Sequence, residues 1–563
     1  MKKKIYILFT IIGLSQNIIC QNNNKNQFDT ENVFLTSNNS IFVVGETLLY
    51  NFNSLNSITN LHSNISKIGH VQLINSKKEI VVDQKLFLNN GICGGDIFIS
   101  PKFNSGTYKL VAFTNWSLNN YENSFFEKDV LIINQFQNVD PEYLNNIKID
   151  SNYNNKEIRL AQKNDNLSIL LNRKTFSKRE AVIFKLIKNN ENLKFNNLTI
   201  SVHKVSLNSN KNNSSLFSKK NTSINLNNNS NLVLPEFRGE IISGKIISKE
   251  NSEVRNKIIS LSISGSSFFV TNTTTNSNGD FYFTIDKKYN KPEILIQVVD
   301  DKKESFEIIL NKNPQIDFSK LKEFKNFSLN EISEFRERAI QSQLENAFYE
   351  AKKDSIINNK SNDLFSKPNV IYKLDDYKRF SNLKEVIVEI VKEVVFEENE
   401  KEKTLKVLNL NNQIELSRPT LILVDGIELQ NLEDLITYNM NMIDKIEVIT
   451  DAYIFHSNFY NGVINFYTKN GNFNLKANGK NNIIKKIETP LALKKYFEPN
   501  YQKENLKNIP DFRRQLKWIT NYNQSDDEEI QFYTSDLIGT FEIKVEGLLN
   551  NELFTITDFI EVK

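Results

Sequence analysis

The chain has 563 residues, of which 24% are charged and 39% are hydrophobic, and its formal net charge is +3. Three lysines at positions 2–4 account for this charge, so the rest of the chain is neutral and lacks the basic field typical of nucleic-acid-binding proteins. We therefore expect no nucleic-acid partner. At about 100 to 150 residues for each domain, the length predicts four or five separate hydrophobic cores.

Residues 1–20 have the pattern of an export signal peptide. The three lysines precede an apolar run over residues 5–14, which is too short to cross a bilayer. We expect cleavage after Cys20, which leaves no transmembrane segment in the mature chain and Cys93 as its only cysteine. The alternative is a lipid anchor at Cys20, but Ile19 is larger than the residue that usually precedes a lipidated cysteine. The expected location is the periplasm or the outer membrane.

Strand-like runs separated by Asn, Ser and Gly dominate residues 33–135. Two early runs are joined by the sequence VGET, and a later run, SGTYKLVAFTNW, alternates between two faces. This order resembles the second macroglobulin domain (MG2) of the α2-macroglobulin superfamily, and the resemblance implies a fibronectin-like β-sandwich. Residues 150–205 resemble a second macroglobulin-like β-sandwich that is less clearly marked.

Members of that superfamily that trap proteases carry a thioester between the Cys and the Gln of a Cys-Gly-Glu-Gln pattern. The comparable stretch here is Cys93-Gly94-Gly95-Asp96, which lacks the glutamine. The resemblance therefore does not extend to thioester chemistry. Cys93 is then expected to be a small apolar residue beside a turn.

Two polar tracts, residues 21–27 and 208–231, bury too little apolar surface to offset the cost of ordering their backbone. We interpret the first as a structureless lead and the second, within residues 206–232, as a linker or loop. Residues 234–312 follow with a strand that carries Gly-Lys, a turn with Asn-Gly and an aromatic alternating strand. This pattern resembles the carboxypeptidase regulatory-like β-sandwich, which commonly precedes plug domains in outer-membrane receptors.

The helical segment over residues 325–360 contains the one convincing long helix, residues 328–353. Ser328 and Glu331 form a capping-box pattern, and apolar residues recur at spacings of three and four. These apolar residues are Ile332, Phe335, Ala339, Ile340, Leu344, Ala347, Phe348 and Ala351. We expect this amphipathic face to pack on the module that follows it in the chain. A partner-binding helix is the alternative.

Residues 376–475 carry the most specific pattern in the chain. LILVDGIEL predicts a buried strand, a tight turn and a return strand, and a short helix capped by Asn431 should follow. IDKIEVIT and NGVINFYTKNG then predict two more strands of a mixed α/β module. In this order and spacing, the motifs resemble the plug domain of TonB-dependent outer-membrane receptors, which sits inside a β-barrel. An unrelated α/β module is the alternative.

A receptor barrel of that class needs about 22 strands of about 9 to 11 residues each. Only 88 residues follow the module, and their alternating runs predict one more β-sandwich over residues 485–563. We therefore expect a plug-like domain without its own barrel, which docks to an outer-membrane β-barrel or to another envelope protein.

Aromatic residues are common interface anchors, and four of them lie between the last two strands of the plug-like module. The candidate partner-binding residues are Tyr453, Phe455, Phe459 and Tyr460. Ordinary core or loop aromatics are the alternative interpretation.

The sequence contains no local signature of catalysis. Its four histidines are widely spaced, and the zinc-protease, nucleophile-elbow and phosphate-loop patterns do not occur. We therefore expect no catalytic residues, no metal and no cofactor.

The sequence as a whole predicts a mostly β, multidomain chain. Its tandem Ig/fibronectin-like β-sandwiches are accompanied by one small α/β plug-like domain and one long amphipathic helix. The expected function is that of an exported, non-enzymatic binding or scaffold protein. One alternative is a macroglobulin-like protease or peptide binder without a thioester, with residues 208–231 as its bait. Another is a hydrolase whose acid pair forms only on folding.

Overall fold

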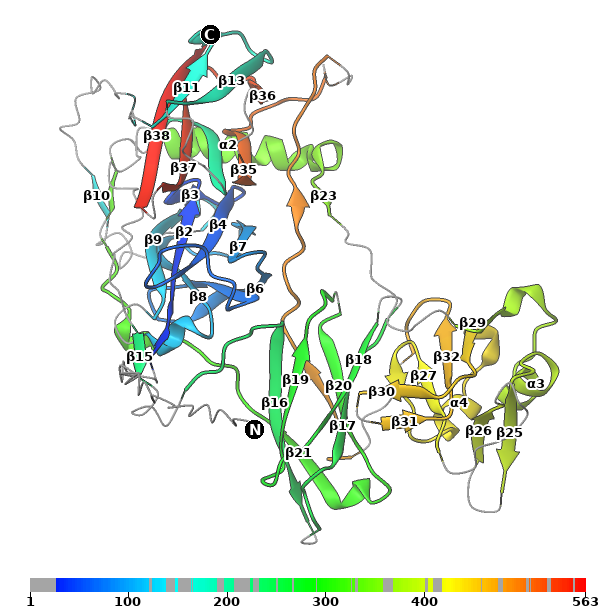
Figure 1. Ribbon diagram of the computed structural model, residues 1–563. Coiled ribbons are helices and arrows are strands. Elements are labelled where there is room, and N and C mark those ends of the chain that lie inside the picture. Colours follow the sequence, from blue (N-terminus) through cyan, green and yellow to red (C-terminus); the bar gives the residue numbers. More distant parts are fainter. Residues whose placement is uncertain are drawn as a thin grey trace, which may run out of the picture.

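The computed structural model describes residues 27–563 except 121–123, 138–146, 150–160, 162–163, 165, 190–196, 207–222, 226–231, 250–251, 266–267, 290, 326, 330–332, 358–367, 400–402, 409–417, 457, 474–478, 503–505, 507, 524–527 and 550–551. The expected signal peptide lies outside these residues. The described chain is mostly β and consists of three β-sandwiches, one α/β module and one long helix (Figure 1). This confirms the predicted fold class.

The first sandwich is formed by residues 31–133. One sheet has the order β2 (Glu31–Ser37), β4 (Thr47–Asn56), β7 (Ile92–Phe98). The other has the order β3 (Ile41–Val43), β9 (Phe126–Ile133), β8 (Gly106–Phe113), β5 (Ile68–Ile74), β6 (Ile80–Phe87), and η1 (Ser117–Asn119) follows β8. Cys93 is buried in the core between the sheets as a free thiol, and its burial raises the pKa of that thiol to about 12.

The second sandwich combines strands from both ends of the chain. One sheet has the order β11 (Leu167–Leu171), β13 (Ala181–Lys188), β36 (Glu529–Tyr533). The other has the order β12 (Thr175–Phe176), β38 (Glu552–Val562), β37 (Gly539–Leu549), β14 (Leu198–Lys204), β35 (Gln515–Tyr522). The prediction of separate sandwiches over residues 150–205 and 485–563 is therefore wrong. Periodicity identifies strands, but it does not identify the distant strands with which they pair.

The third sandwich has one sheet with the order β19 (Asp280–Ile285), β16 (Glu240–Ser248), β21 (Phe306–Leu310). Its other sheet has the order β18 (Phe269–Thr274), β17 (Ile258–Ile263), β20 (Glu293–Val299), β33 (Asn482–Lys486). The last of these strands comes from beyond the predicted limits of 234–312, because the chain returns to this sheet after the α/β module. The 3₁₀ turns η3 (Lys303–Ser305) and η4 (Phe318–Lys320) flank β21.

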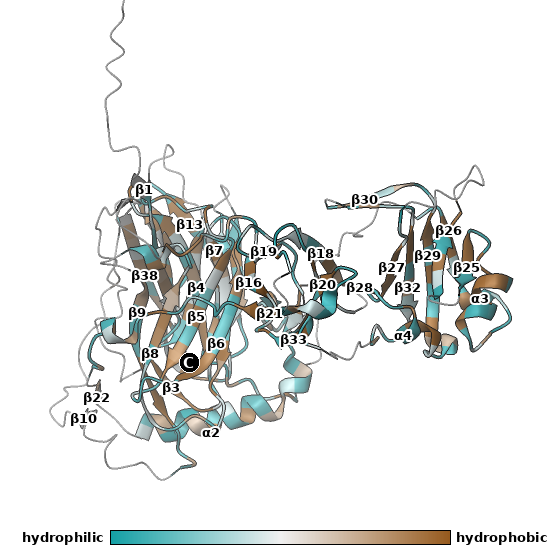
Figure 2. Cartoon of the chain, turned by 90° about the horizontal axis from the view of Figure 1, so that it is seen from below, coloured by the Kyte–Doolittle hydropathy of each residue, from teal (hydrophilic) through white to brown (hydrophobic). Residues whose placement is uncertain are grey.

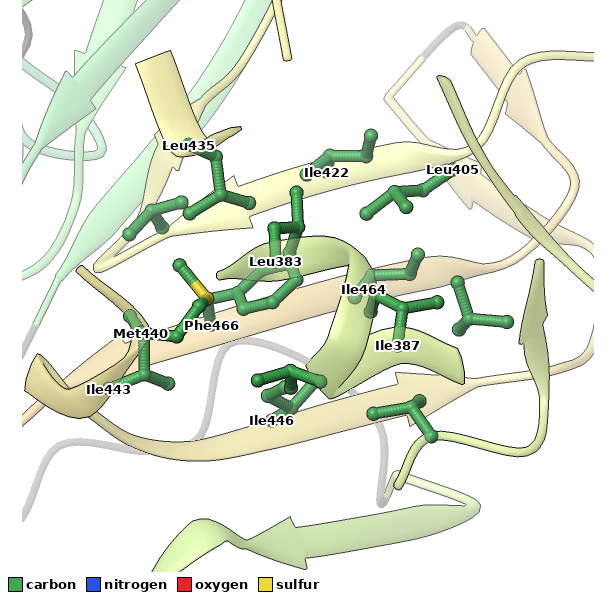
Figure 3. Close-up of a cluster of buried hydrophobic side chains, with 14 of the residues drawn as sticks. Leu383, Ile387, Leu405, Ile422, Leu435, Met440, Ile443, Ile446, Ile464 and Phe466 are labelled. Carbon is green, nitrogen blue, oxygen red and sulfur yellow. The ribbon is translucent and has the colours of Figure 1, made fainter. Parts of the chain in front are cut away.

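The α/β module is built on a five-stranded sheet with the order β24 (Val370–Lys373), β29 (Ile443–Ile449), β32 (Val463–Thr468), β27 (Leu421–Val424), β28 (Ile427–Glu428). The other elements are η6 (Leu374–Asp376), α3 (Leu383–Glu389), the hairpin β25 (Val394–Glu398) and β26 (Lys403–Val407), α4 (Glu433–Ile436), η7 (Met440–Met442), β30 (Tyr453–Phe455) and β31 (Asn458–Tyr460). Figure 3 shows apolar side chains of α3 facing those of β27, β29 and β32.

The sandwiches and the module are nested in one another. After the module, β33 completes the third sandwich, β34 (Lys494–Lys495) pairs with β23 (Ser355–Ile356), and the last four strands complete the second sandwich (Figure 1). The polar tracts also take part in pairing, because β1 (Gln27–Asp29) pairs with β15 (Ser223–Asn225). The prediction of a structureless lead is therefore wrong at Gln27, and that of a linker or loop is wrong at residues 223–225; the rest of both tracts lies outside the described residues. A further short pair joins β10 (Ile147–Ile149) to β22 (Phe327–Leu329).

The long helix α2 (Ser333–Ala347), followed by η5 (Tyr349–Lys352), packs on the first sandwich and not on the module. Phe335 and Ala339 lie against Ile41 and Val43 of β3. In Figure 2 the helix runs beneath the first two sandwiches, away from the module. Ile340 and Phe348 of the predicted apolar stripe are exposed. The expected contact with the module was wrong because helical spacing does not specify which surface the helix covers.

A buried ion pair joins the first sandwich to the third. Lys85 of β6 pairs with Glu240 of β16, and both residues are less than 5% exposed. The Lys85 ammonium also donates to the Tyr289 hydroxyl at 3.2 Å and to the Glu488 carbonyl at 2.9 Å. The Tyr289 hydroxyl in turn donates to the second Glu240 oxygen at 2.5 Å. Each charge in this contact is therefore compensated.

Replacement of Lys85 by Met should lower the free energy of unfolding by about 3 to 5 kcal/mol, because it leaves the Glu240 carboxylate buried without its cation. The measurement is the first transition in urea. Adding Glu240→Gln to Lys85→Met should recover part of this loss. If the double variant were less stable than Lys85→Met alone, the unpaired charge would not be the cause.

His62 lies between the first and second sandwiches. Its Nε2 is 3.2 Å from Asn53 Oδ1, and its Nδ1 is 3.4 Å from Asn197 Nδ2. Burial lowers the pKa of His62 to about 4, below the value of about 6.5 of an exposed histidine. Between about pH 6.5 and about pH 4, His62 binds a proton in the unfolded chain but not in the folded chain. Its contribution to the free energy of unfolding is therefore fully present above about pH 6.5 and is lost as the pH falls toward about 4.

We predict that lowering the pH from about 7 to about 4.5 reduces the free energy of unfolding less in His62→Gln than in the unmodified chain. The difference between the two reductions should be about 2 kcal/mol. Urea midpoints at the two pH values provide the measurement. Equal losses in both proteins would show that His62 does not carry this pH dependence.

Candidate functional site

The four aromatic residues predicted to bind a partner lie on the hairpin formed by β30 and β31. Tyr453 pairs with Tyr460, and Ile454 pairs with Phe459. Because successive side chains of a strand point to opposite faces, the hairpin has two different surfaces. Phe455 and Tyr460 are each 6% exposed and pack on Val270 of the third sandwich, and Tyr453 is half-buried against the same cluster. A partner cannot reach Phe455 or Tyr460 in this arrangement, so the prediction is wrong for these two residues.

The opposite surface of the hairpin carries Ile454 and Phe459, which are 61% and 55% exposed. The Arg418 guanidinium lies 5.4 Å from the centre of the Phe459 ring, a cation–π contact. We call these three residues the outer hairpin surface. Of the predicted aromatic residues, only Phe459 belongs to it. Sequence reasoning missed Ile454, although its alternation with Tyr453 and Phe455 was a usable signal.

The inward face of the hairpin belongs to a contact between the module and the third sandwich. Glu428 links Tyr460 to the third sandwich. Its carboxylate accepts a hydrogen bond from the Tyr460 hydroxyl at 3.4 Å, and its backbone carbonyl accepts one from Gln297 Nε2 at 2.7 Å. Burial raises the pKa of the Glu428 carboxyl. His456 Nε2 lies 2.9 Å from the Thr271 hydroxyl, and burial lowers the pKa of its imidazole. These polar links fix which surface of the hairpin remains exposed.

The Asp425-Gly426 turn has a structural role within the module. Asp425 is 1% exposed, and its carboxylate accepts the Thr468 amide at 2.8 Å, the Thr468 hydroxyl at 2.5 Å and the Phe473 amide at 3.0 Å. Gly426 has a φ of +82°, and a Cβ there would meet the ring of Phe268. The aspartate therefore holds the end of β32, while the glycine allows the third sandwich to approach.

A second candidate site is a cleft of about 920 Å³ between α2 and the first two sandwiches. The first sandwich contributes the β3–β4 turn and the end of β7, and the second contributes β14 and β35. The segment that contains β34 forms a further wall. Sequence reasoning missed this cleft, because its walls come from distant stretches of the chain and no local pattern relates them.

Within the described ranges, no group of three His, Cys, Asp or Glu side chains is placed to hold a metal ion. Among the described helices, none is both long enough and apolar enough to span a bilayer. The tract considered as a protease bait, residues 208–231, lies outside the described residues except for β15.

Neither a protein-family model nor a curated protein matches the chain. Among solved structures, a mutant α-2-macroglobulin of Salmonella is 8% identical with a TM-score of 0.23, over 95% of this chain and 39% of that one. An Escherichia coli α-2-macroglobulin activated by porcine elastase is 8% identical with a TM-score of 0.24, over 95% and 44% of the two chains.

The adhesin InvE of Yersinia pseudotuberculosis is 10% identical with a TM-score of 0.13, over 49% of this chain and 57% of that one. The chain spans less than half the length of the two macroglobulins. TM-scores this low carry no argument about the family, the activity or the partners of this chain.

We predict that Asp425→Ala loosens the end of β32, because the Thr468 and Phe473 amides lose a charged acceptor in a buried place. The local cost should be about 3 kcal/mol. Hydrogen–deuterium exchange of peptides over residues 463–473 measures it. Asp434→Ala, at an exposed position of the same module, is the control and should leave exchange unchanged. Equal exchange in the two variants would exclude the proposed role of Asp425.

Proposed function

We propose that this protein is an exported, non-enzymatic binding protein of the bacterial envelope. Its plug-like module would be carried on the third sandwich and would present the outer hairpin surface to an outer-membrane β-barrel or to another envelope protein. The observation that carries the proposal is the exposure of Ile454 and Phe459, beside Arg418, on a hairpin whose other face is fixed by burial.

The position of the module supports this proposal. In both views the module lies at one end of the molecule, and the third sandwich separates it from the first two (Figures 1 and 2). The third sandwich covers part of the module and leaves Ile371, Tyr377 and Val388 exposed as well. A module held in this way can meet a partner without rearrangement of the other domains.

The chemistry of the outer hairpin surface also suits protein binding. Aromatic and arginine side chains dominate the residues that contribute most to protein interfaces. Ile454 and Phe459 would supply apolar area, and the Arg418 guanidinium, held over the Phe459 ring, would add a positive charge at its edge. The surface is small, so it would form the centre of a contact that extends over more of the module.

We predict that a photo-crosslinking amino acid at Phe459 captures an envelope protein in intact cells of the source bacterium. The control position is Tyr282, an aromatic residue of β19 that is 51% exposed on the third sandwich. A product that forms from position 459 and not from position 282 would support the proposal.

A Phe459→Glu variant, tested with the crosslinker at Ile454, should reduce that product by about tenfold or more, because it places a charge at the centre of the contact. Identical products from positions 459 and 282, or no product from either Ile454 or Phe459, would exclude this surface as the partner site.

A further inference from the structure

The cleft between α2 and the first two sandwiches has the size of a small-molecule site and does not involve the hairpin. Its volume of about 920 Å³ falls within the range of about 300 to 1,000 Å³ found for such sites. A second cavity, of about 380 Å³, shares Tyr496, Phe497 and Glu498 with it as a common wall. The cleft is therefore a defined space between domains.

Two buried hydrogen-bond donors in the wall of the cleft have no partner among the described residues. Arg338 is 1% exposed and donates to both Glu46 oxygens, at 2.9 and 2.6 Å, and to the Ile41 carbonyl at 2.8 Å, but its Nη1 has no acceptor. Trp518 is 6% exposed, and its Nε1 also has no acceptor. An unmade hydrogen bond at a buried donor costs about 1 to 3 kcal/mol. A ligand with a hydrogen-bond acceptor could remove this cost at both donors.

Positive charges are crowded in the same wall. Arg514 donates to Glu334 at 3.0 Å, and its pKa is lowered by burial and by the nearby Arg338. The pKa of Lys204 is lowered by burial and by Arg514. The nearby Glu334 and Glu337 oppose this repulsion at both Arg514 and Lys204, and a negative charge bound in the cleft would oppose it further.

Three carboxylates of the cleft are each paired with a cation, although Asp96 Oδ1 has no hydrogen-bond partner among the described residues. Glu46 pairs with Arg338, Asp96 with Lys494 at 2.8 Å, and Glu345 with Lys352 at 2.8 Å. Burial raises the pKa of Glu345 and that of Asp354, which disfavours their negative charge. These carboxylates are therefore already paired and offer little to a bound cation, so the cleft suits an anion better than a cation.

Much of the remaining wall is apolar. Phe42, Val44, Phe497, Phe512 and Leu516 line the cleft. Three further aromatic residues in its wall are exposed to solvent, namely Phe98, Phe136 and Tyr349. Exposed apolar side chains gathered at a concave surface are typical of a binding site.

We propose that this cleft binds a small organic anion in which a carboxylate is attached to an extended apolar chain. The carboxylate accepts hydrogen bonds from Arg338 Nη1 and Trp518 Nε1, and the apolar chain lies along the phenylalanine-lined wall. A purely apolar ligand would leave both donors unpaired, while a small polar anion would leave the aromatic wall exposed to water.

The test uses equilibrium dialysis of decanoate, below the concentration at which it aggregates, with the full chain. We expect saturable binding at one site for each chain. Decanol, which has the same chain without the charge, and propionate, which has the charge without the chain, should each bind at least about tenfold more weakly.

Two variants locate the site. Ala347 is an exposed residue of α2 that lines the cleft, and Ala347→Phe should obstruct the cleft and weaken decanoate binding by about tenfold or more. Ile340→Phe is the matched control, because Ile340 is exposed on the same helix outside the cleft, and it should leave binding unchanged. Trp518→Phe keeps an aromatic ring but removes the donor, and should weaken binding by about tenfold.

Arg338 is left in place, because its loss would leave Glu46 without its cation and threaten folding. Thermal unfolding of each variant shows whether the fold is intact. The proposal would be overturned by any of three results. These are a lack of saturable decanoate binding, binding of decanol as tight as that of decanoate, or undiminished decanoate binding by a folded Ala347→Phe variant.

Discussion

The structure depends on one constraint, the position of strand β14 between two strands from the end of the chain. β14 pairs with β37 along one edge and with β35 along the other, and β13 pairs with β36 in the facing sheet. Apart from the pairing of β11 with β13, the described strands between residues 167 and 204 therefore have their neighbours among residues 515–562. Everything between them, including the third sandwich and the module, is an insertion into a domain that closes around it.

The same nesting explains how a small module becomes part of a large molecule. β33 returns to the edge of the third sandwich, and β34 pairs with β23 on the way to the second. The module is therefore joined to the body by its buried contact and by two passages of the chain. Buried polar groups such as Lys85 and Glu240 add specificity to the contacts between sandwiches, because they find partners in only one arrangement.

Local elements could be predicted from the sequence, and their partners could not. The run before Asp425-Gly426 forms β27, and the stretch from Val463 to Thr468 forms β32, because apolar runs and turn residues act over a few positions. The same reasoning predicted that α2 packs on the α/β module, whereas it packs on the first sandwich. It also assigned the strands of the second sandwich to two separate domains. Both predictions failed because neither periodicity nor composition encodes contacts between distant residues. It identified the aromatic residues of the hairpin but not which of them face the third sandwich. The cleft had no local signal at all.

The closure of the second sandwich has a consequence for synthesis. A ribosome makes the early strands of this domain long before it makes their neighbours, so the apolar faces of β13 and β14 stay uncovered until residues 515–549 emerge. During that interval the nascent chain needs protection from aggregation. Once β35, β36 and β37 have paired with β13 and β14, the domain is complete, whereas a chain cut before residue 515 would leave these early strands without those neighbours.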